Sequence, residues 1–456
     1  MLVEGRTLGK YDLSRGNVMG FTENLELTET KLKRIAALSA AKPEMMFTNV
    51  IHHFNEESLR ACFHELDGKK ALGIDGIDKA CYGKNLDENL RNLVDRMKRM
   101  AYIPGAVRQV LIQKDDKSKG FRSLGVSNFE DKVVQRMMQK VLESIYEPLL
   151  HPDTYGFRSG RSCHDAIRAL YTHLYTHDVE TVIDVDLSNY FGSISHQEAI
   201  KIIRKKISDP RLIRYLIRMF KSGVLSDGEL TVSDEGVVQG SCCSPVIANI
   251  VADEVICKWF EKTVKTHCYG EVKLILYADD MVICCQYHKD AVKIKRALSL
   301  RLQKYGLKMN EEKTKLVPFS KRMQKLSKNQ GTFDFLGFTF YIGKSQKGFH
   351  IVKVKTIGKR VRAKLKKVNV WVREIRNKYS LQQVMKEAAI KLRGHIQYYG
   401  VSFNYKAVQT FVYRTIRILF KWLNRRSQRK SFNWEQFQEF LNRVKFPEAR
   451  ICHKLF

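Results

Sequence analysis

The sequence predicts a mixed α+β protein with more than one domain. It has 456 residues, of which 44% are hydrophobic and 10% aromatic, so it can fold around real apolar cores. Strand-like and helix-like segments alternate up to about residue 340, without the regular spacing of repeated βαβ units. After about residue 350 the chain becomes strongly basic and helical in its periodicity. We therefore expect an α+β part followed by an α-helical part.

The net charge of the chain indicates what kind of molecule it binds. There are 80 Lys and Arg against 48 Asp and Glu, a formal net charge of +32. Such an excess favours a polyanion, either nucleic acid or an anionic membrane surface. The most apolar window, residues 237–252, contains Gln239, Pro245 and Asn249 and is too polar to span a bilayer. The composition therefore predicts nucleic acid as the partner and no membrane.

The cysteines and the N-terminus indicate the compartment. Ten cysteines are scattered without a C-x-x-C spacing, so they suggest neither a zinc ribbon nor a redox site. The opening "MLVEGRTLGK" lacks the charged-then-apolar pattern of a secretory signal. We expect a reducing, intracellular location.

The first part of the chain contains patterns typical of helices, a turn and a hairpin. Residues 28–41 have a basic amphipathic helix pattern that Pro43 ends, and residues 59–66 repeat apolar side chains at helical spacing. Residues 69–78 are a Gly- and Asp-rich turn, and residues 107–128 predict a hairpin with a cationic loop. Two helices, a turn and a hairpin are therefore expected before the central strands.

An acidic pair stands between two apolar strands in "ILYADDMVIC", residues 275–284. The apolar flanks predict two core strands, with Asp279 and Asp280 at the turn that joins them. Adjacent carboxylates among apolar residues are unfavourable unless something positive neutralises them. The pattern therefore raises the question of which cation they hold.

A second acidic strand lies upstream in "TVIDVDLSNYFGSI", residues 181–194. Strand alternation puts Asp184 and Asp186 on one face, opposite Ile183 and Val185. If this strand lies beside the later hairpin, Asp186 and Asp279 converge on one point. Gathered carboxylates are oxygen ligands for hard cations such as Mg²⁺, and two such ions support in-line phosphoryl displacement.

The last part of the chain is cationic. Residues 351–430 contain 22 Lys and Arg but only two acids, Glu374 and Glu387. Apolar residues recur at helical spacing from Val361 to Val372, so one helix face packs while the other stays basic. This composition predicts a helical nucleic-acid-binding region.

Together these motifs resemble the reverse transcriptase–maturase family encoded by group II introns. "DLSNYF" and "YADD" match its two catalytic motifs, and "VVQGSCCSPVIANIVAD" is similar to its Q-G-x-x-x-S-P-x-x-A-N block. The resemblance covers about residues 25–456. Its further segments are "QKDDKSKGFRSLGV", "TYGFRSGRSCHDAI", "GLKMNEEKTKL", "FDFLGFTF", "KLRGHIQYYGVSFN" and "FKWLNRRSQRKSFNWEQF".

The resemblance implies a right-hand polymerase fold of α+β class. Residues 1–55 would be an N-terminal extension with a basic helix, and residues 56–345 the fingers and palm. Residues 346–456 would form the α-helical thumb, or maturase domain X. No C-terminal endonuclease is expected after "RICHKLF", so a nick or a replication fork would supply the primer.

By the same resemblance, Asp186 and Asp279 are the catalytic, metal-binding acids, and Asp280 is an accessory one whose alternative is a plain turn acid. The implied cofactor is Mg²⁺, with Mn²⁺ as a possible substitute. Asp184 is left outside the site.

The implied dNTP pocket combines a triphosphate grip with a steric gate. A Lys–Arg pair would hold the phosphates, an aromatic ring would exclude a 2′-hydroxyl, and a Lys would protonate pyrophosphate. The alternatives are surface cations for the grip and a core aromatic for the gate. Gly192 stands where the family usually has Asp, and Gln113 where it usually has Pro. The predicted dNTP-binding residues are Lys114, Arg122, Phe191, Gln239, Gly240 and Lys313.

Contacts to nucleic acid are expected from arginines interleaved with aromatic residues. "YGFRSGRS" has the alternative of a structural loop packed beneath the fingers, and Tyr398 and Tyr399 could equally belong to the core. The predicted nucleic-acid-binding residues are Arg158, Arg161, Arg393, Arg425 and Arg426.

The implied function is RNA-directed DNA synthesis on a structured RNA, such as an intron or a noncoding RNA, from a DNA or RNA primer and dNTPs. An intron-encoded protein of this kind also assists splicing and mobility, in the cytoplasm or nucleoid of a bacterium or in an organelle. Two alternatives stay open: a domesticated relative in phage defence or DNA repair, and a splicing cofactor with incidental polymerase activity. An RNA-dependent RNA polymerase is disfavoured by Phe191 and by "YADD".

Overall fold

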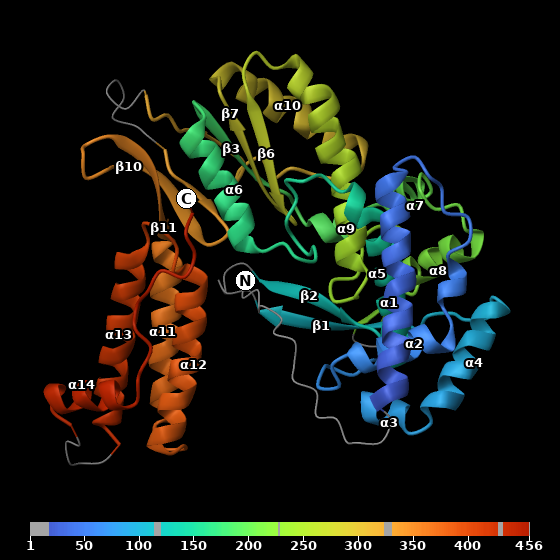
Figure 1. Ribbon diagram of the computed structural model, residues 1–456, viewed down its shortest axis with the longest axis horizontal. Coiled ribbons are helices and arrows are strands. Elements are labelled where there is room, and N and C mark those ends of the chain that lie inside the picture. The colour runs from blue at the N-terminus through green and yellow to red at the C-terminus, as the bar shows by residue number, and fades with distance from the viewer. Residues whose placement is uncertain (1–17, 114–119, 227–228, 323–330, 427–431, 456) are drawn as a thin grey trace. The chain divides into compact units, whose positions relative to one another are not determined.

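The computed structural model describes residues 18–113, 120–226, 229–322, 331–426 and 432–455 (Figure 1). Helices and strands both build it, which confirms the α+β class. The chain divides into two compact units, each assembled from three stretches. The first unit comprises Met1–Gly160, Leu187–Thr266 and Arg296–Asn310, and the second comprises Arg161–Asp186, His267–Lys295 and Glu311–Phe456. The domain boundaries after residues 55 and 345 stay a prediction.

The first unit is mainly helical. The predicted helix 28–41 is the later part of α1, which ends at Ala41 just before Pro43. The second predicted helix is α2, which starts at Glu56 because Asn55 and Ser58 form a capping box. The helices of this unit are α1 (Val18–Ala41), η1 (Ile51–His53), α2 (Glu56–Glu65), α3 (Lys79–Gly83), α4 (Leu86–Lys98), α5 (Phe129–Tyr146), η3 (Glu147–Leu149), η4 (Tyr190–Ser193), α7 (His196–Ile203), α8 (Pro210–Phe220), α9 (Ser244–Ala252), η5 (Asp253–Cys257) and η6 (Phe260–Val264).

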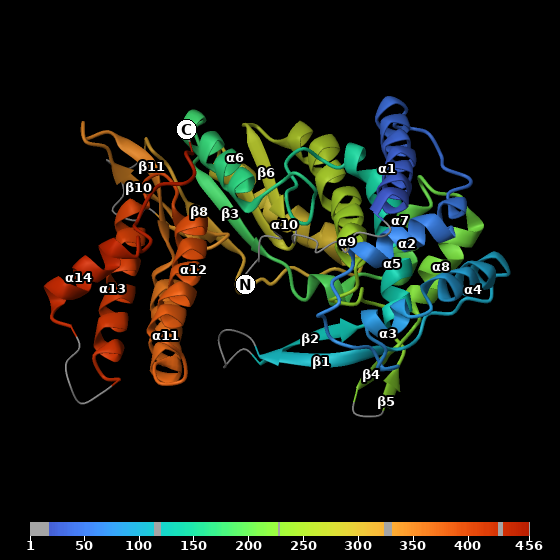
Figure 2. The ribbon, with the colours of Figure 1, turned by 60° about the horizontal axis from the view of Figure 1, so that its bottom comes forward.

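One four-stranded sheet belongs to the first unit, in the order β2-β1-β4-β5. Its strands are β1 (Val107–Gln113), β2 (Phe121–Val126), β4 (Val224–Ser226) and β5 (Glu229–Thr231). The β1–β2 pair confirms the predicted hairpin, with Ile112 opposite Arg122. Figure 2 shows β4 and β5 continuing the sheet beyond β1. Most residues of these strands are exposed or half-buried, so this sheet presents much of its surface to solvent.

A second four-stranded sheet, in the order β6-β7-β3-β8, is the centre of the second unit. Its strands are β3 (Thr181–Asp186), β6 (Val272–Tyr277), β7 (Asp280–Cys285) and β8 (Lys315–Pro318). The apolar runs before and after the acids are buried, as at Ile183, Ile275 and Ile283, which are at most 1% exposed. Burial of these side chains stabilises the strands that end at the acids.

The rest of the second unit is a small sheet and a group of helices. The sheet has the order β11-β10-β9, with β9 (Phe333–Phe335), β10 (Phe338–Lys344) and β11 (His350–Thr356). The helices are α6 (Cys163–Thr176), α11 (Gly358–Ile375), α12 (Leu381–Tyr399), α13 (Tyr405–Leu423) and α14 (Trp434–Arg443), and α10 (His288–Lys304) contributes its residues up to Lys295. Among the helices described, none is both long enough and apolar enough to cross a membrane.

Candidate active site

Asp186 faces Asp280 across the buried sheet of the second unit. β3 and β7 pair antiparallel, with Asp186 opposite Asp280 and Asp184 opposite Val282. Opposed residues of an antiparallel pair project to the same face, so Asp184, Asp186 and Asp280 lie on one face of the sheet. Asp279 occupies the turn directly before β7. The structure therefore gathers the predicted acids at one end of one sheet.

The turn that carries Asp279 is tight. Tyr277 pairs with Asp280, so Ala278 and Asp279 alone connect β6 to β7. Ala278 has a φ of 55°, a left-handed conformation that costs a non-glycine residue on the order of 1–3 kcal/mol. The buried strands on both sides hold the turn in this conformation. Asp279 is therefore fixed at the tip of a rigid hairpin.

Negative charge accumulates at this end of the sheet. Desolvation by the surrounding protein, followed by the charge of Asp279, raises the pKa of Asp280 to about 6. Part of the Asp280 side chain nevertheless reaches solvent. Desolvation, followed by the charges of Asp280 and Asp334, raises the pKa of Asp184 to about 7. The cations of the protein thus leave the acids only partly neutralised.

Lys313 lies beside the same acids. It stands in the segment between α10 and β8, and β8 pairs with β3 so that Lys315 is opposite Asp184. The Nζ atom of Lys313 is 3.0 Å from Oδ2 of Asp186. The structure therefore brings this predicted residue into contact with a predicted metal-binding acid.

The residues at this site fit a divalent cation. Raised carboxyl pKa values caused by burial and like charge are the condition that a bound Mg²⁺ relieves. The donors are carboxylate oxygens, the ligands that Mg²⁺ prefers. Within the described residues, Asp186, Asp279 and Asp280 do not form a group whose ligand atoms all lie within 4.8 Å of one another. Asp186 and Asp279, with Asp280 beside them, remain the candidates to hold the ion.

Arg122, Gln239 and Gly240, predicted to bind the dNTP, lie along β2. Arg122 is exposed on this strand. Three residues further on, Gly125 N donates a 2.6 Å hydrogen bond to Gln239 O. Gly240 has a φ of +117°, and a Cβ there would lie 2.4 Å from Gly125 O. Only glycine allows this close approach, so the Gln239–Gly240 segment is held against the strand that carries Arg122. Lys114 lies outside the described residues.

Phe191 belongs to the same neighbourhood. Its carbonyl oxygen accepts a 2.8 Å hydrogen bond from Val237 N, two residues before Gln239. The ring is half-buried and packs edge-on against Phe157, with centroids 6.2 Å apart. A Cβ at Gly192 would lie 2.3 Å from Nδ2 of Asn189, so a larger residue here would require the Asn189 side chain to move.

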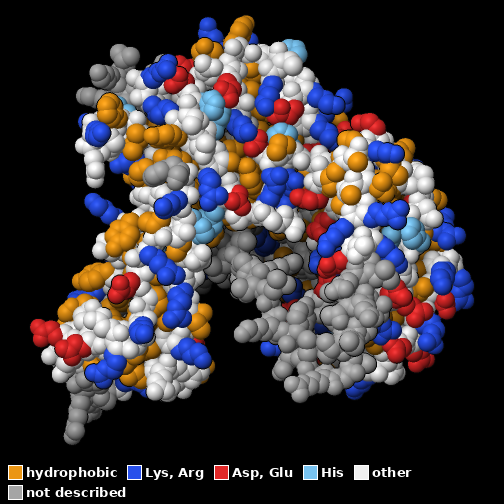
Figure 3. All heavy atoms as spheres, in the orientation of Figure 1, with side chains coloured by type: hydrophobic (Ala, Val, Ile, Leu, Met, Phe, Trp, Pro, Cys, Tyr) orange, Lys and Arg blue, Asp and Glu red, His pale blue; other side chains and the backbone are white. Residues whose placement is uncertain are grey.

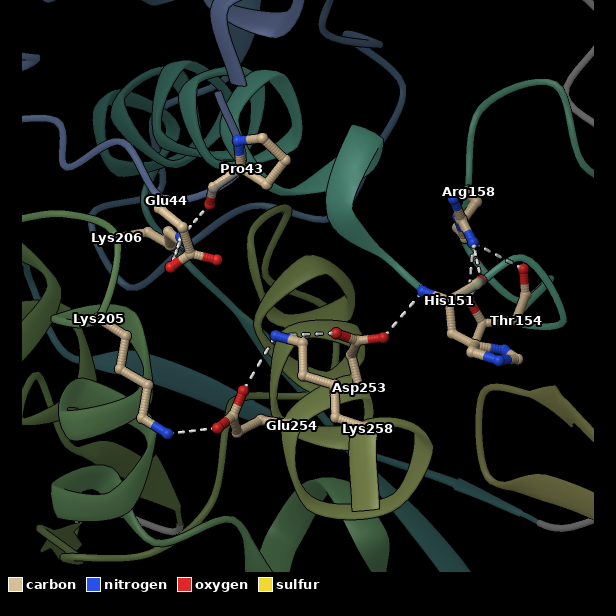
Figure 4. Close-up of polar contacts among 10 residues, drawn as sticks. All are labelled: Pro43, Glu44, His151, Thr154, Arg158, Lys205, Lys206, Asp253, Glu254 and Lys258. Carbon is tan, nitrogen blue, oxygen red and sulfur yellow. Dashed lines mark hydrogen bonds and ion pairs between the residues drawn. The ribbon is translucent and has the colours of Figure 1, made fainter. Parts of the chain in front are cut away.

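Arg158 makes internal contacts (Figure 4). It is 7% exposed, and its Nη1 donates to the carbonyl oxygens of His151 and Thr154 at 2.7 and 3.0 Å. Its Nε also donates to Glu147 at 2.8 Å. In the same network His151 N donates to Asp253 at 2.8 Å, and Asp253 pairs with Lys258 at 3.3 Å. These contacts favour the structural alternative for Arg158. Arg161 is half-buried.

The basic helices expose most of their predicted arginines. Figure 3 shows Lys and Arg side chains spread over this helical region. Arg393 and Arg425 are exposed, and the guanidinium of Arg425 lies 5.4 Å from the ring centroid of Trp422. Arg426 Nη2 donates to Tyr379 O at 3.0 Å. Exposed cations beside aromatic rings suit a nucleic-acid backbone with unstacked bases.

Tyr398 and Tyr399 belong to the core of the second unit. The hydroxyl of Tyr398 donates to Leu336 O at 2.8 Å, and its ring stacks on Phe338 with centroids 5.9 Å apart. Tyr399 is 9% exposed. The structure thus favours the core alternative for both tyrosines.

Sequence reasoning missed one cation near the acids. Arg360, in the first turn of α11, hydrogen-bonds Tyr399 and lowers the pKa of Asp280 through its charge. Its only signal in the sequence was membership of a cationic helix. The fold of the second unit, rather than any local motif, brings this residue within electrostatic reach of the acids.

Comparison with known proteins agrees with this site. A family model described as reverse transcriptase (RNA-dependent DNA polymerase) matches residues 112–340. Protein YkfC of Escherichia coli (strain K12) is 36% identical over 191 residues, which cover 41% of this chain and 49% of that protein. Group II intron-encoded protein LtrA of Lactococcus lactis subsp. cremoris is 29% identical over 226 residues, which cover 49% of this chain and 37% of LtrA.

A third relative is an uncharacterized 91 kDa protein in the cob intron of Schizosaccharomyces pombe (strain 972 / ATCC 24843). It is 35% identical over 185 residues, which cover 41% of this chain and 20% of that protein. The chain thus spans less than half the length of each of these three relatives. With the family model matching half of the chain and the acids placed as described, this chain belongs to the reverse transcriptase family and is of its group II intron-like kind.

Proposed function

We propose that this protein is an RNA-directed DNA polymerase that extends a primer with dNTPs along an RNA template. The observation that supports this most is the position of Asp186 opposite Asp280, with Asp279 in the adjoining turn. Carboxylates at the end of a buried sheet, with raised pKa values, are suited to holding divalent metal for phosphoryl transfer.

The acids and Lys313 have separate roles in this proposal. Asp186 and Asp279 hold the Mg²⁺ ions, for which Mn²⁺ can substitute, and Asp280 adds negative charge beside them. Held there, the ions would supply Lewis-acid activation of the primer 3′-hydroxyl and neutralisation of the charge on the leaving pyrophosphate. Lys313, whose Nζ lies 3.0 Å from Asp186, moves to the pyrophosphate and donates a proton to it.

The dNTP is gripped and selected by the other predicted residues. Lys114 and Arg122 bind the triphosphate, the Lys as a point charge and the Arg through two parallel hydrogen bonds. Gln239 and Gly240 line the pocket against β2, where glycine admits close backbone approach. Phe191 excludes the 2′-hydroxyl of a ribonucleotide, with its ring supported by Phe157.

The partner in this proposal is a structured RNA, the intron that encodes the protein. The cations of α11 to α13 and of the segment that follows α13, with Arg393, Arg425 and Arg426 among them, bind the phosphates of the template–primer duplex. Affinity for RNA should therefore fall steeply with rising salt. Similarity to LtrA, whose name describes a group II intron-encoded protein, supports a role in splicing and mobility as well as in copying.

The domesticated relative and the splicing cofactor remain as second candidates. A cofactor that only binds RNA needs neither Asp186 and Asp279 nor the glycine at position 240, which favours the polymerase over it. The domesticated relative would use the same site on a different RNA. Intron RNA domains flanking the gene would support mobility, and a dedicated noncoding RNA beside it would support defence or repair.

The test is primer extension on poly(rA)/oligo(dT) with labelled dTTP and Mg²⁺. Wild-type protein should extend the primer, and Asp279→Ala should not. Asp87→Ala is the matched control, because Asp87 is an exposed acid on α4 that pairs with Arg60. It should extend the primer at the wild-type rate.

Failure of the wild type must be separated from misfolding. If the protein is folded, binds RNA with salt-dependent affinity and still extends no primer, the general polymerase proposal is wrong. A repeat with RNA transcribed from the region that flanks the gene then distinguishes an enzyme restricted to its own RNA from a splicing cofactor.

A further inference from the structure

Two histidines and a glutamate gather where α6 ends and β6 begins. His173 lies in the last turn of α6, His177 follows four residues later, and Glu271 directly precedes β6. Their ligand atoms all lie within 4.8 Å of one another. In the part of the chain that the structure describes, no other group of three or more His, Cys, Asp or Glu is drawn together in this way.

We propose that His173, His177 and Glu271 form a Zn²⁺ site that is separate from the catalytic acids. Two imidazole nitrogens and one carboxylate oxygen are a ligand set that Zn²⁺ takes in a four-coordinate site, with water in the fourth position. The Nε2 atom of His177 is already 3.5 Å from Oε1 of Glu271. Bonds of about 2.0–2.1 Å in a tetrahedral site place neighbouring ligands roughly 3.3 Å apart, so small side-chain rotations suffice.

The surrounding contacts orient two of the ligands. The Nδ1 atom of His177 lies 2.7 Å from Oγ1 of Thr176 and 3.3 Å from the carbonyl oxygen of His173. A proton on Nδ1 that is shared with these oxygens leaves the Nε2 lone pair directed at Glu271, as in metal-bound histidines. Glu271 N donates to Gln286 Oε1 at 2.9 Å, and Glu271 O accepts from Gln286 N at 3.0 Å. The backbone of Glu271 is thus fixed before a cation binds.

The burial of the three side chains suits a metal reached from solvent. His173 is 6% exposed and stacks on the ring of His177, with centroids 4.5 Å apart. The side chains of His177 and Glu271 are 43% and 53% exposed. One side of the group is therefore supported by the core, and the other is open to an arriving ion.

A second stacked histidine pair shows what a purely structural arrangement looks like. The rings of His164 and His453 are 3.7 Å apart. However, Nε2 of His164 lies 2.8 Å from Tyr398 O, and Nε2 of His453 lies 2.8 Å from Gln397 O. These nitrogens contact backbone carbonyl oxygens, and among the described residues no carboxylate joins the two histidines in a ligand group. The His173 group differs in that Glu271 joins its two histidines within ligand distance.

Zinc at this position would link the end of α6 to the edge strand β6. β6 ends the sheet order β6-β7-β3-β8, and it leads from Glu271 to the turn that carries Asp279. α6 lies beside β6 in both ribbon views (Figures 1 and 2). Imidazole ligands select Zn²⁺ over Mg²⁺, so the ion would stabilise the second unit without competing for the catalytic carboxylates.

The test is metal binding by the full chain, tag-free and stripped with EDTA, and it is independent of polymerase activity. Titration with Zn²⁺ against a chromophoric chelator should show one equivalent bound. His177→Ala and Glu271→Gln, both at exposed positions, should weaken that binding at least about tenfold. His267→Gln removes an exposed histidine outside the group and should bind as the wild type does. Co²⁺ should give the intense visible absorption of a tetrahedral site.

Two comparisons make the outcome decisive. Asp279→Asn should keep the Co²⁺ spectrum, and Zn²⁺ should raise the unfolding temperature of wild type but not of His177→Ala. The proposal is overturned if the wild type binds no Zn²⁺, or if His177→Ala binds it as tightly as the wild type. It is equally overturned if Asp279→Asn abolishes binding, because the ion would then belong to the catalytic acids.

Discussion

The two four-stranded sheets of this protein are built in opposite ways. In the order β6-β7-β3-β8, most residues of β3, β6 and β7 are buried, and the exposed or half-buried positions include the acids. In the order β2-β1-β4-β5, most residues are exposed or half-buried, including Leu111 at 57% and Phe121 at 59%. The sheet β6-β7-β3-β8 presents carboxylates, and the sheet β2-β1-β4-β5 presents Arg122.

The difference follows from what each sheet is proposed to hold. Metal-binding carboxylates must keep fixed positions, and strands buried on both sides of the acids supply that rigidity. A triphosphate and a nucleic acid arrive from solvent, so the residues that grip them lie on an open surface. Substitutions in the buried sheet should therefore affect stability or chemistry strongly, while those in the open sheet should mainly affect binding.

The largest effect is expected within β3. Asp186→Asn should lower kcat by at least about 10³-fold, because loss of a metal ligand removes several kcal/mol of transition-state stabilisation. Asp184→Asn, two residues away on the same face, should stay within about tenfold of the wild type. Steady-state primer extension measures both. Equal losses in the two variants would show that total charge on this face matters more than one ligand.

The next largest effect is on stability, and it should differ between a buried residue of one sheet and an exposed residue of the other. Ile183 is 0% exposed, so Ile183→Ala should lower the free energy of unfolding by about 2–5 kcal/mol. Leu111→Ala should change it by less than about 0.5 kcal/mol. Urea denaturation followed by circular dichroism measures both values. A large loss at Leu111 would mean that the open sheet is covered in solution.

A smaller effect concerns the grip on the triphosphate. Arg122→Ala should raise the KM for dNTP by about 10- to 100-fold, because a charge-assisted contact contributes about 1.5–3 kcal/mol. Arg108 is its matched control, since it is exposed on β1, opposite Val126. Arg108→Ala should leave the KM within about twofold. Similar increases in both variants would indicate a general electrostatic effect of the sheet instead of a specific grip.

The smallest effect is a pH dependence at the base of the open sheet. Asp131 is 4% exposed and accepts hydrogen bonds from the Tyr102 hydroxyl at 2.5 Å and Gly105 N at 3.0 Å, just before β1. Burial raises its pKa to about 6 from an ordinary value of 3.8. Because the folded state binds this proton more tightly, the stability that it contributes is present below pH 4 and is lost as the pH rises to about 6.

Asp131→Asn should remove this part of the pH profile. Between pH 4.5 and 7, the free energy of unfolding of the wild type should decline by about 2 kcal/mol more than that of the variant. Urea denaturation at a series of pH values gives the difference between the two slopes. Parallel profiles would show that Asp131 ionises in the folded protein as easily as in the unfolded one.

Local patterns predicted much of the fold. The helix ending at Ala41, the hairpin of β1 and β2, and the strands on either side of Asp279 are all confirmed, because turn residues and apolar periodicity act over a few residues. The full length of α1 was not expected, and neither was the detailed arrangement of β8 to β11. Those elements depend on partners that lie far away in the sequence.

The sequence alone was sufficient to single out the acids as candidates. Asp186, Asp279 and Asp280 stand out as charges within or next to apolar strands, and that local conflict is visible without a structure. Tertiary structure was needed to set Asp186 opposite Asp280, to bring Lys313 and Arg360 to the same end of the sheet, and to draw His173, His177 and Glu271 together. Strand register and helix packing join residues roughly 100 positions apart, and no local pattern encodes such distances.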